Sequence, residues 1–440
     1  MQSETDQVDV TVIGGGLAGM AASIHLTDAG LRVVCIETDP VDADPVGESL
    51  DWSAPDLLKR LGLPMEHLLE QGIATFKHHV VLKLADGSQR QYIPGEWLGK
   101  PPYNIDLRTL HVDRGQLNQA LREIFLGKGI RLVNDRVVDI ETTGQIVKAV
   151  VSAKGERFRS RWFLDASGSA ASLFPRIFKL PVYEYGPHKV AIWDYFTVPE
   201  SIEGTTLHAD GAGPRYMEWV WQIPIHPRTI SVGYVSPGDA VKEKRQRGLS
   251  IQDIFDAQLK RFPDLQGLCH DPEKRPPRTT SFRCRVFAKT AGPNWLVAGE
   301  AAAMIDPMTS NGVTAALRNA AEASRLIIRF RDRTRIPRLP ASMYSQRVLS
   351  LARFFNSAIE DVLYDWPIRN RIGPFNAGDV YTIPAWSINA IYSRSRPQGF
   401  VSTTLFRLLL ASLRYSLSAF HWFCSRWVSS PPISTASQVL

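Results

Sequence analysis

The sequence predicts a mixed α/β fold, in which a parallel nucleotide-binding sheet is joined to an antiparallel β-sheet domain and a helical C-terminal region. A glycine-rich turn follows an apolar strand near the N-terminus. Alternating stretches rich in β-branched and aromatic residues fill 176–289, and the pattern becomes helical after residue 332. A chain of 440 residues is long enough for two fused domains.

The glycine turn lies in a βαβ unit of the Rossmann type. Residues 8–13 (VDVTVI) form the first strand, GGGLAG opens a helical pattern, and LRVVCIE is a second strand that ends at Glu37, 18 residues after Gly19. This context is typical of a GxGxxG turn that binds a dinucleotide. Gly14 allows the tight turn, Gly16 lets the backbone approach a diphosphate, and Gly19 permits close helix packing. The Glu37 carboxylate can accept hydrogen bonds from ribose hydroxyls.

The predicted nucleotide-binding domain is discontinuous. One apolar strand ends at Asp165, shortly before Gly168, and a later strand from Trp295 to Ala298 leads through Glu300 to a helix that starts near Gly312. No second GxGxxG turn in βαβ context follows the first. The expected division is 8–175 and 290–332 for the nucleotide-binding domain, 176–289 for a β-sheet substrate domain, 333–430 for a helical region, and 431–440 for a flexible tail.

The composition limits which binding partners and which cellular compartment we expect for this protein. The net charge of +7 comes from 51 basic and 44 acidic residues spread along the chain, which favours anionic ligands or an acidic membrane surface and predicts no nucleic-acid partner. The four cysteines form no CxxC pair, so neither a zinc site nor a disulfide framework is indicated. The polar start MQSETDQVD has no basic, apolar export segment, and we expect a cytoplasmic protein.

The segment 405–428 (LFRLLLASLRYSLSAFHWFCSRWV) predicts an amphipathic helix with an unusually wide apolar face. Its polar positions fall in one narrow stripe: Arg407, Arg414, Ser418, His421 and Ser425. The arginines argue against a membrane-crossing helix. Two interpretations remain: the helix docks on the protein's own core or a subunit partner, or it lies peripherally on the inner membrane surface.

The strand–GxGxxG, LDASG and GE…DP…NG segments, spread from residue 10 to about 330, resemble the FAD-binding fold of aromatic hydroxylases, geranylgeranyl reductases and flavin-dependent halogenases. VGESL, which contains Ser49, resembles a segment of the halogenase and geranylgeranyl reductase branches. VDRGQLNQAL places Arg114 where that family has a flavin-contacting arginine. The resemblance implies FAD as cofactor, with these ligands: Gly14, Gly16, Gly19, Glu37, Ser49, Arg114, Asp165, Gly168, Glu300, Asp306, Pro307, Asn311 and Gly312.

The hexapeptide Trp219-Val220-Trp221-Gln222-Ile223-Pro224 fits the WxWxIP signature of flavin-dependent halogenases. The resemblance implies that Trp219, Trp221, Ile223 and Pro224 belong to the substrate pocket. In a strand, Trp219, Trp221 and Ile223 share one face, and Val220 and Gln222 the other. The alternative is that the two tryptophans are simply the packed inner face of a sheet.

The segment from Asp306-Pro307 to Asn311-Gly312 is similar to the DPxxSxG loop of the same family. Backbone N–H groups at the start of a helix lack partners and carry the positive end of the helix dipole. Asn311 and Gly312 therefore suit either a halide, chloride or bromide, or the pyrimidine edge of the flavin. The two alternatives stay open.

The halogenase resemblance also implies a lysine that receives hypohalous acid, formed from reduced FAD, O2 and halide. Lys77 lies at the family's position, and Lys83 is the second candidate, while a surface lysine is the alternative for either. Two departures bear on the site. Glu300 replaces the aspartate of the family, and Thr309 stands where tryptophan-specific halogenases carry a glutamate, which disfavours free tryptophan as substrate.

Three functions follow from these features. The first is a halogenase-like enzyme that acts on a small phenolic, pyrrolic or lipophilic substrate and receives reduced FAD from a separate flavin reductase. The second is a reductase or hydroxylase of the same fold, since fold does not fix chemistry. The third is a non-catalytic, membrane-associated flavoprotein. A requirement for halide separates the first from the second, and substrate-dependent oxidation separates both from the third.

Overall fold

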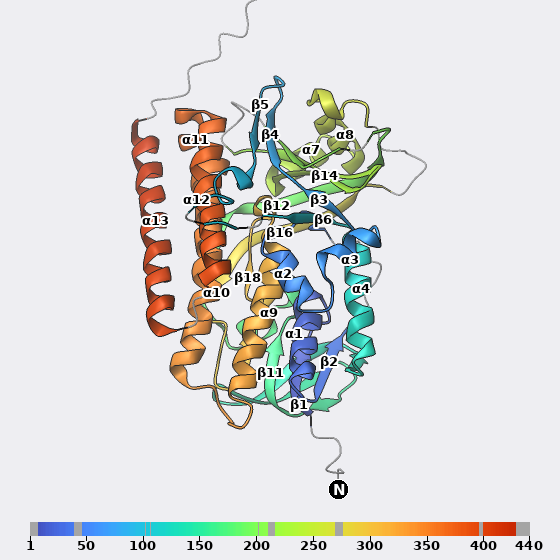
Figure 1. Ribbon diagram of the computed structural model, residues 1–440, viewed down its shortest axis with the longest axis vertical. Coiled ribbons are helices and arrows are strands. Elements are labelled where there is room, and N and C mark those ends of the chain that lie inside the picture. Colours follow the sequence, from blue (N-terminus) through green and yellow to red (C-terminus); the bar gives the residue numbers. More distant parts are fainter. Residues whose placement is uncertain are drawn as a thin grey trace, which may run out of the picture.

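The computed structural model describes residues 8–38, 46–101, 103–105, 107–200, 202–209, 216–268, 276–395 and 399–427. The tail predicted at 431–440 lies outside these ranges, as does Cys269. Cys35, Cys284 and Cys424 are buried free thiols. The mixed α/β class predicted from the sequence is confirmed, with the parallel sheet at one end of the molecule and the long C-terminal helices along one side (Figure 1).

A five-stranded parallel sheet, in the order β17-β11-β1-β2-β7, forms the nucleotide-binding end. The pairing of β1 with β2 is parallel, which confirms the predicted βαβ unit. Helix α1 crosses between these strands and packs against α4 and α9. The bounds are β1 Val8–Ile13, β2 Val33–Glu37, β7 Arg131–Asn134, β11 Ser160–Asp165, β17 Trp295–Val297, α1 Leu17–Asp28, α4 Arg114–Gly127 and α9 Gly312–Arg329.

An eight-stranded sheet in the order β18-β16-β12-β15-β14-β13-β4-β5 forms the second layer. Its neighbours pair antiparallel, except that β13 runs parallel to β4. Strands β4 and β5 join this sheet from a segment that we expected in the nucleotide-binding part. The bounds are β4 Val80–Leu84, β5 Gln89–Tyr92, β12 Val182–Thr197, β13 Thr205–Ala209, β14 Trp219–His226, β15 Thr229–Pro237, β16 Arg278–Phe287 and β18 Ala303–Met304.

Strand β14 is buried on both faces. Trp219, Trp221 and Ile223 belong to the main hydrophobic core, whereas Val220 packs with Phe255 in a separate cluster under α7 (Gly238–Gln246) and α8 (Ile251–Leu259). The predicted alternation of faces along this strand is therefore confirmed. The strand lacks an alternating polar pattern because both of its faces are covered.

Smaller elements connect the two layers. A two-stranded sheet of β3 (Ala74–Lys77) and β6 (Thr109–Val112) leads directly into β4, so the chain passes between sheets just after Lys77. In the described ranges, the remaining elements before α9 are α2 Ala54–Lys59, α3 Met65–Glu70, β8 Val137–Thr143, β9 Ile146–Ser152, β10 Arg157–Phe158, α5 Gly168–Ala171, α6 Leu173–Ile177 and the short 3-10 helices Pro94–Glu96, Pro263–Leu265, Gly299–Ala301 and Pro307–Thr309.

The C-terminal region consists of α10 (Arg338–Ile359), a π-helical turn (Glu360–Tyr364), α11 (Trp366–Ile372), α12 (Pro374–Ser395) and α13 (Phe400–Trp427). Helix α13 begins five residues before the predicted start at 405 and packs on α10 and α11.

The inner face of α13 buries Phe406, Leu410 and Cys424. The Ser418 hydroxyl donates to an Asp361 carboxylate oxygen over 3.0 Å, so part of the predicted polar stripe points inward. This is the docking on the protein's own helices that one of our two interpretations predicted.

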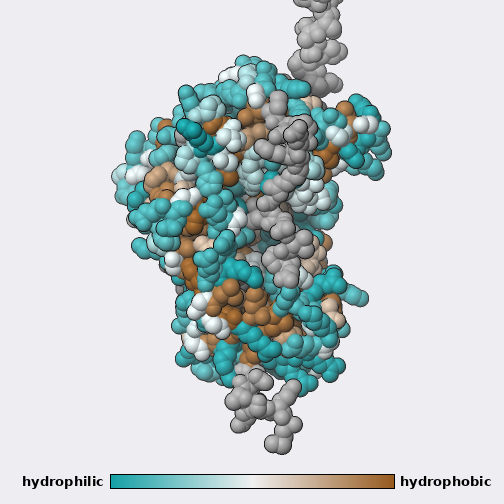
Figure 2. Space-filling model, turned by 90° about the vertical axis from the view of Figure 1, so that its right-hand side faces the viewer, coloured by the Kyte–Doolittle hydropathy of each residue, from teal (hydrophilic) through white to brown (hydrophobic). Residues whose placement is uncertain are grey.

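The outer face of α13 remains apolar, with the side chains of Leu405 and Leu408 about three-fifths exposed (62% and 61%). None of the helices in the described ranges is long and apolar enough to cross a membrane. The opposite side of the molecule is mostly hydrophilic, with hydrophobic residues gathered toward the end that carries β1 and β2 (Figure 2).

Candidate active site

The glycine turn has the geometry that a dinucleotide needs. Gly14 has a positive φ of 96°, and a Cβ there would lie 2.4 Å from the Ala166 carbonyl oxygen. A Cβ on Gly19 would lie 1.8 Å from the Gly14 carbonyl oxygen, so α1 packs too closely for any other residue. Gly16, the N-cap of α1, faces open space instead. The residues present therefore fit a diphosphate held at the start of this helix.

Glu37 is brought to the glycine turn, as predicted from its place at the end of the second strand. Its carboxylate accepts a hydrogen bond from the Gly15 backbone N–H. The second carboxylate oxygen accepts from the Thr38 hydroxyl over 2.9 Å. The acid is therefore fixed beside the turn, where a ribose bound next to the diphosphate can reach it.

Asp165 shapes the chain instead of facing a ligand. It is fully buried; one carboxylate oxygen accepts from the Ser167 N–H (3.1 Å) and hydroxyl (2.5 Å), and the other from the Phe174 N–H (2.7 Å). Burial raises the pKa of this carboxyl, against the opposing Ser167 hydrogen bonds. Gly168 has a positive φ of 78° in the same turn, and Glu300 is exposed in the 3-10 helix Gly299–Ala301.

Arg114 begins α4 and reaches the segment that follows the second strand. Its guanidinium donates to the carbonyl oxygens of Val46 (3.3 Å) and Gly47 (3.5 Å). Burial lowers the pKa of Arg114, and the nearby Glu48 opposes that shift. Glu48 is itself buried and accepts from the Ser231 hydroxyl over 3.0 Å, and burial raises its pKa. We did not assign Glu48 a role from the sequence, although it lies within the VGESL segment.

A cavity of about 320 Å³ opens between the β3–β4 junction, β13, β14, the loop before α9, and α12. Apolar and aromatic side chains make up much of its wall, among them Leu50, Trp52, Phe76, Tyr92, Met217, Trp219, Leu363 and Trp386. At one end Trp52 and Trp386 meet edge to face with ring centroids 5.7 Å apart. Pockets of this size and lining are typical of small-molecule sites.

Lys77, the last residue of β3, lies in the cavity wall. Its ammonium donates to the Leu50 carbonyl oxygen over 3.1 Å. Burial lowers the pKa of Lys77 to about 8, and the negative charge of Asp51 opposes this shift. Lys83, by contrast, forms an ion pair with Asp264 and is not among the residues that line the cavity. The structure thus places the first lysine candidate at the cavity and the second away from it.

The loop before α9 also forms part of the wall through Thr309, Ser310 and Asn311. The Asn311 side-chain oxygen accepts from the Asn389 amide over 2.8 Å, which fixes the residue that caps α9. The Ser310 hydroxyl donates to the Ser49 hydroxyl over 3.2 Å. A Cβ at Gly312 would meet nothing within 4 Å, so the first amide groups of α9 remain approachable.

Asp306 anchors this loop, and Pro307 begins the 3-10 helix within it. One Asp306 carboxylate oxygen accepts from the Met308 N–H (3.0 Å) and the Tyr364 hydroxyl (3.1 Å), and the other accepts from the Lys189 ammonium (2.7 Å). The carboxylate is fully buried, and its oxygens are therefore occupied within the chain. Asp306 shapes the loop, whereas Thr309 to Asn311 face the cavity.

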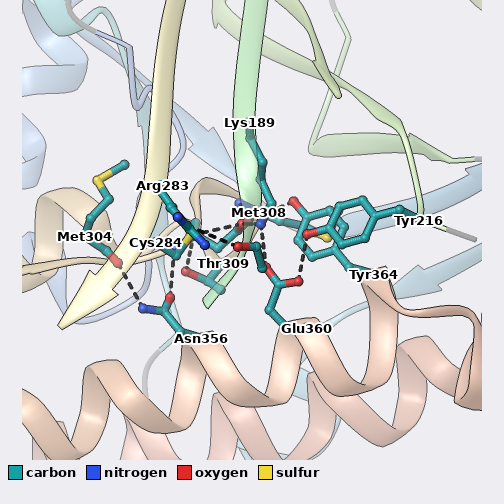
Figure 3. A network of polar contacts seen from close by, with 12 residues as sticks. Lys189, Tyr216, Arg283, Cys284, Met304, Met308, Thr309, Asn356, Glu360 and Tyr364 are labelled. Carbon is teal, nitrogen blue, oxygen red and sulfur yellow. Dashed lines mark hydrogen bonds and ion pairs between the residues drawn. The ribbon is translucent and has the colours of Figure 1, made fainter. Parts of the chain in front are cut away.

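A buried charge cluster around Lys189 was not predicted from the sequence. Figure 3 shows the Lys189 ammonium between β12 and the helical segment that carries Glu360. The ammonium nitrogen lies 2.6 Å from a carboxylate oxygen of Glu360. The Tyr216 hydroxyl donates to the same carboxylate over 2.7 Å. Burial opposes the charge on Lys189, but Asp306 and Glu360 together raise its pKa above the ordinary value. A lone lysine in the apolar stretch HKVAIW gives no sequence signal for partners so distant along the chain.

The WxWxIP residues divide between two places. Trp219 lines the cavity, and its indole N–H donates to the Tyr364 hydroxyl over 2.8 Å. The other three predicted pocket residues are not among those that line the cavity. Trp221 covers Gly233 and donates to the Ser231 hydroxyl (3.0 Å), Ile223 is buried in the core, and the Pro224 carbonyl oxygen accepts from the Thr75 hydroxyl (2.9 Å). The strand runs away from the cavity after Trp219, so its later residues pack the core.

Comparison with known proteins gives two family matches. The tryptophan halogenase family model matches residues 106–353, which is more than half of the chain. The FAD dependent oxidoreductase model matches residues 9–174, including the glycine turn.

Several relatives share this similarity. Flavin-dependent halogenase armH5 of Armillaria mellea is 26% identical over 348 residues, which cover 72% of this chain and 64% of that protein. Tryptophan 2-halogenase of Chondromyces crocatus is 28% identical over 333 residues, covering 71% and 59%. The 1H-pyrrole-2-carbonyl-(peptidyl-carrier protein) brominase of Pseudoalteromonas luteoviolacea is 27% identical over 342 residues, covering 74% and 78%. The aligned region spans less than two thirds of the first two relatives.

Solved structures share the fold. The flavin-dependent brominase Bmp2 superposes with a TM-score of 0.68 at 19% identity, covering 95% of this chain and all (100%) of that chain. A variant of the halogenase PltM in complex with FAD gives a TM-score of 0.66 at 14% identity, covering 96% and 95%.

Proposed function

This chain belongs to the tryptophan halogenase family and takes FAD as its cofactor, and on that premise we propose that it halogenates a small aromatic substrate. The observation that carries the proposal is Lys77, which lies in the wall of the cavity with its pKa lowered to about 8 by burial. An amine with such a pKa can hold hypohalous acid by hydrogen bonding and can give up or take a proton near neutral pH.

The chain's own residues have separate tasks in this proposal. Gly14, Gly16 and Glu37 would hold the diphosphate and ribose of FAD, and we assign Arg114 and Ser49 to its flavin end. FAD, once bound and reduced, would supply the electrophilic halogen together with O2 and a halide. The amide groups at the start of α9 suit chloride or bromide, since they carry the positive end of the helix dipole. Lys77 directs the halogen within the cavity, much of whose wall is apolar.

The substrate follows from the cavity wall. Its aromatic end, with Trp52 and Trp386, suits a phenolic or pyrrolic ring, and edge-to-face contacts between aromatic rings are favourable. Thr309 has no carboxylate to offer, which argues against free tryptophan. The electrons come from a separate flavin reductase, because the sequence offers no second nucleotide-binding unit.

We propose that the protein is cytoplasmic and makes peripheral contact with the inner membrane surface. The outer face of α13 supports the latter, because Leu405 and Leu408 are exposed beside Arg407. Sedimentation of the full chain with vesicles containing anionic phospholipid tests it. We expect co-sedimentation, which a Leu405→Ser/Leu408→Ser variant loses, whereas equal recovery of both proteins in the supernatant rejects membrane contact.

Halide dependence tests the enzymatic proposal. The protein is incubated with FAD, a flavin reductase, NADH, O2 and a panel of phenols and pyrroles, with and without bromide, and products are read by mass spectrometry. We expect monobrominated products that appear only with bromide. Product formation that is equal without halide supports the alternative reductase or hydroxylase, to which the relatives above lend no support. Bound FAD that turns over no substrate supports a non-catalytic flavoprotein.

A further inference from the structure

One acidic residue in the cavity wall suits a task in the proposed reaction. Among the described residues that line the cavity, Asp51 is the only acid, and it is buried with about 4% of its surface exposed. One of its oxygens, Oδ1, accepts from the Ser53 N–H over 2.8 Å and from the Ser53 hydroxyl over 2.6 Å. The Ser53 hydroxyl in turn accepts from the Arg318 guanidinium over 2.7 Å. The carboxylate is therefore held rigidly by one side.

The other oxygen, Asp51 Oδ2, is buried and has no hydrogen-bond partner. A buried carboxylate oxygen without a donor is costly, and in a native protein it calls for an explanation, such as a catalytic role or a bound water or ion. An acceptor of this kind needs an O–H or N–H group. A phenol or a pyrrole offers one, and the corresponding ether or N-alkyl compound does not.

Asp51 is fixed beside the proposed catalytic lysine. The Lys77 ammonium donates to the carbonyl oxygen of Leu50, the residue before Asp51. The Thr109 hydroxyl donates to the carbonyl oxygens of Leu50 (3.2 Å) and Asp51 (2.8 Å), which ties this backbone to β6. Lys77, from β3, and Asp51, from the segment before α2, thus both lie in the wall of the same cavity.

We propose that Asp51 Oδ2 binds the O–H or N–H group of the substrate and accepts its proton during halogenation. This inference rests on the proposed function. It assigns to Asp51 the general base that Thr309 cannot provide. It also restricts the substrate to aromatic rings that carry a hydroxyl or ring N–H.

The protons and electrons balance with hypohalous acid as the oxidant. A ring carbon donates an electron pair to the halogen, so the carbon–halogen bond forms while the halogen–oxygen bond breaks. Asp51 takes the O–H or N–H proton, and the departing hydroxide leaves as water with a proton from the Lys77 ammonium. Loss of the ring C–H proton to Lys77 then restores aromaticity, and Asp51 returns its proton to the substrate.

Substitution of Asp51 by asparagine tests the base role, since Asn keeps the size and removes the basicity. Turnover is measured at one pH with a series of phenols whose own pKa falls from well above to below that pH. We expect Asp51→Asn to lower kcat by about 100-fold or more for un-ionised phenols. For phenols that are already ionised, we expect kcat of the variant to approach that of the wild type. A purely structural role of Asp51 would not produce this dependence on the phenol. A loss that is the same for every phenol overturns the proposal.

Binding supplies a second test that needs no turnover. Wild-type protein loaded with FAD is titrated with a phenol and with its O-methyl ether, and the same pair is titrated against Asp51→Asn and Lys83→Ala. We expect the wild type and Lys83→Ala to bind the phenol at least about tenfold more tightly than the ether. Asp51→Asn loses this preference. Equal affinity of the wild type for both compounds overturns the proposal, even where halogenation itself is confirmed.

Discussion

The Trp219 indole N–H donates to the Tyr364 hydroxyl over 2.8 Å, and this pair connects the cavity wall to the loop before α9. The Tyr364 hydroxyl in turn donates to the Asp306 carboxylate, which caps the 3-10 helix Pro307–Thr309. Trp219 comes from the large sheet, and Tyr364 follows the long helix α10. The substrate side and the predicted flavin side of the site are thus joined through one buried tyrosine.

We expect removal of the Tyr364 hydroxyl to destabilise the fold and to leave FAD binding at the glycine turn intact. In Tyr364→Phe, the Trp219 indole and one Asp306 oxygen each lose a buried hydrogen bond. We expect the free energy of unfolding to fall by about 1–3 kcal/mol. Chemical denaturation measures this loss, and flavin absorbance shows that FAD remains bound. An unchanged denaturation midpoint contradicts the proposed link.

The charge cluster predicts a strong dependence on Lys189. Lys189→Met leaves the buried Asp306 and Glu360 carboxylates without their cation, and we expect a loss of about 3–5 kcal/mol in the free energy of unfolding at neutral pH. Burial already raises the pKa of Glu360, so its folded form holds a proton at pH values where the unfolded chain has lost it. Stability of the variant therefore rises as the pH falls. The double variant Lys189→Met/Glu360→Gln recovers part of the lost stability. Denaturation curves at two pH values measure both effects, and a Lys189→Met variant that is no more stable at the lower pH contradicts this prediction.

The lowered pKa of Lys77 predicts selective reactivity. Its neutral form becomes dominant above about pH 8, whereas an ordinary lysine remains protonated to above pH 10. Brief acetylation at a series of pH values, followed by peptide mass spectrometry, measures the labelling of Lys77. We expect this labelling to rise through a midpoint near pH 8. Labelling of Lys77 that rises only above about pH 10 contradicts its burial.

The open space at Gly16 predicts that a side chain there blocks the cofactor and spares the fold. Gly16 has extended backbone angles that valine tolerates, and no atom lies within 4 Å of its added Cβ. We expect Gly16→Val to lower FAD affinity by about 100-fold or more while thermal unfolding of the FAD-free protein stays within a few degrees. Gly127→Val at the end of α4, also beside open space, is the matched control and keeps FAD. Normal FAD binding by Gly16→Val removes the glycine turn as the diphosphate site.

Local patterns made one part of the site predictable. The strand, glycine turn and acid at Glu37 lie within one βαβ unit, where short-range sequence spacing fixes the geometry. Lys77 was found through resemblance, and its place in the cavity depends on the chain leaving β3 for β4 at that point. The tail of the WxWxIP motif was harder to place, because a buried strand looks the same in sequence whether it faces a cavity or a packed core.

Long-range contacts account for what the sequence did not predict. Lys189 and Glu360 are 171 residues apart, and neither stands in a motif. The addition of β4 to the large sheet depends on its pairing with β13, more than 120 residues later. The free oxygen of Asp51 is recognised only when its neighbours are known, because Ser53 satisfies the other oxygen.

Bromination of a phenol by Lys77→Ala and Lys83→Ala, each supplied with reduced FAD, O2 and bromide, tests whether Lys77 directs the halogen. Both variants must first show wild-type FAD absorbance, so that a loss of product reports on the lysine. We expect Lys83→Ala to give the paired bromine isotope masses at close to the wild-type rate, and Lys77→Ala to lose at least about 100-fold of that rate. Undiminished bromination by Lys77→Ala rules out this role for Lys77.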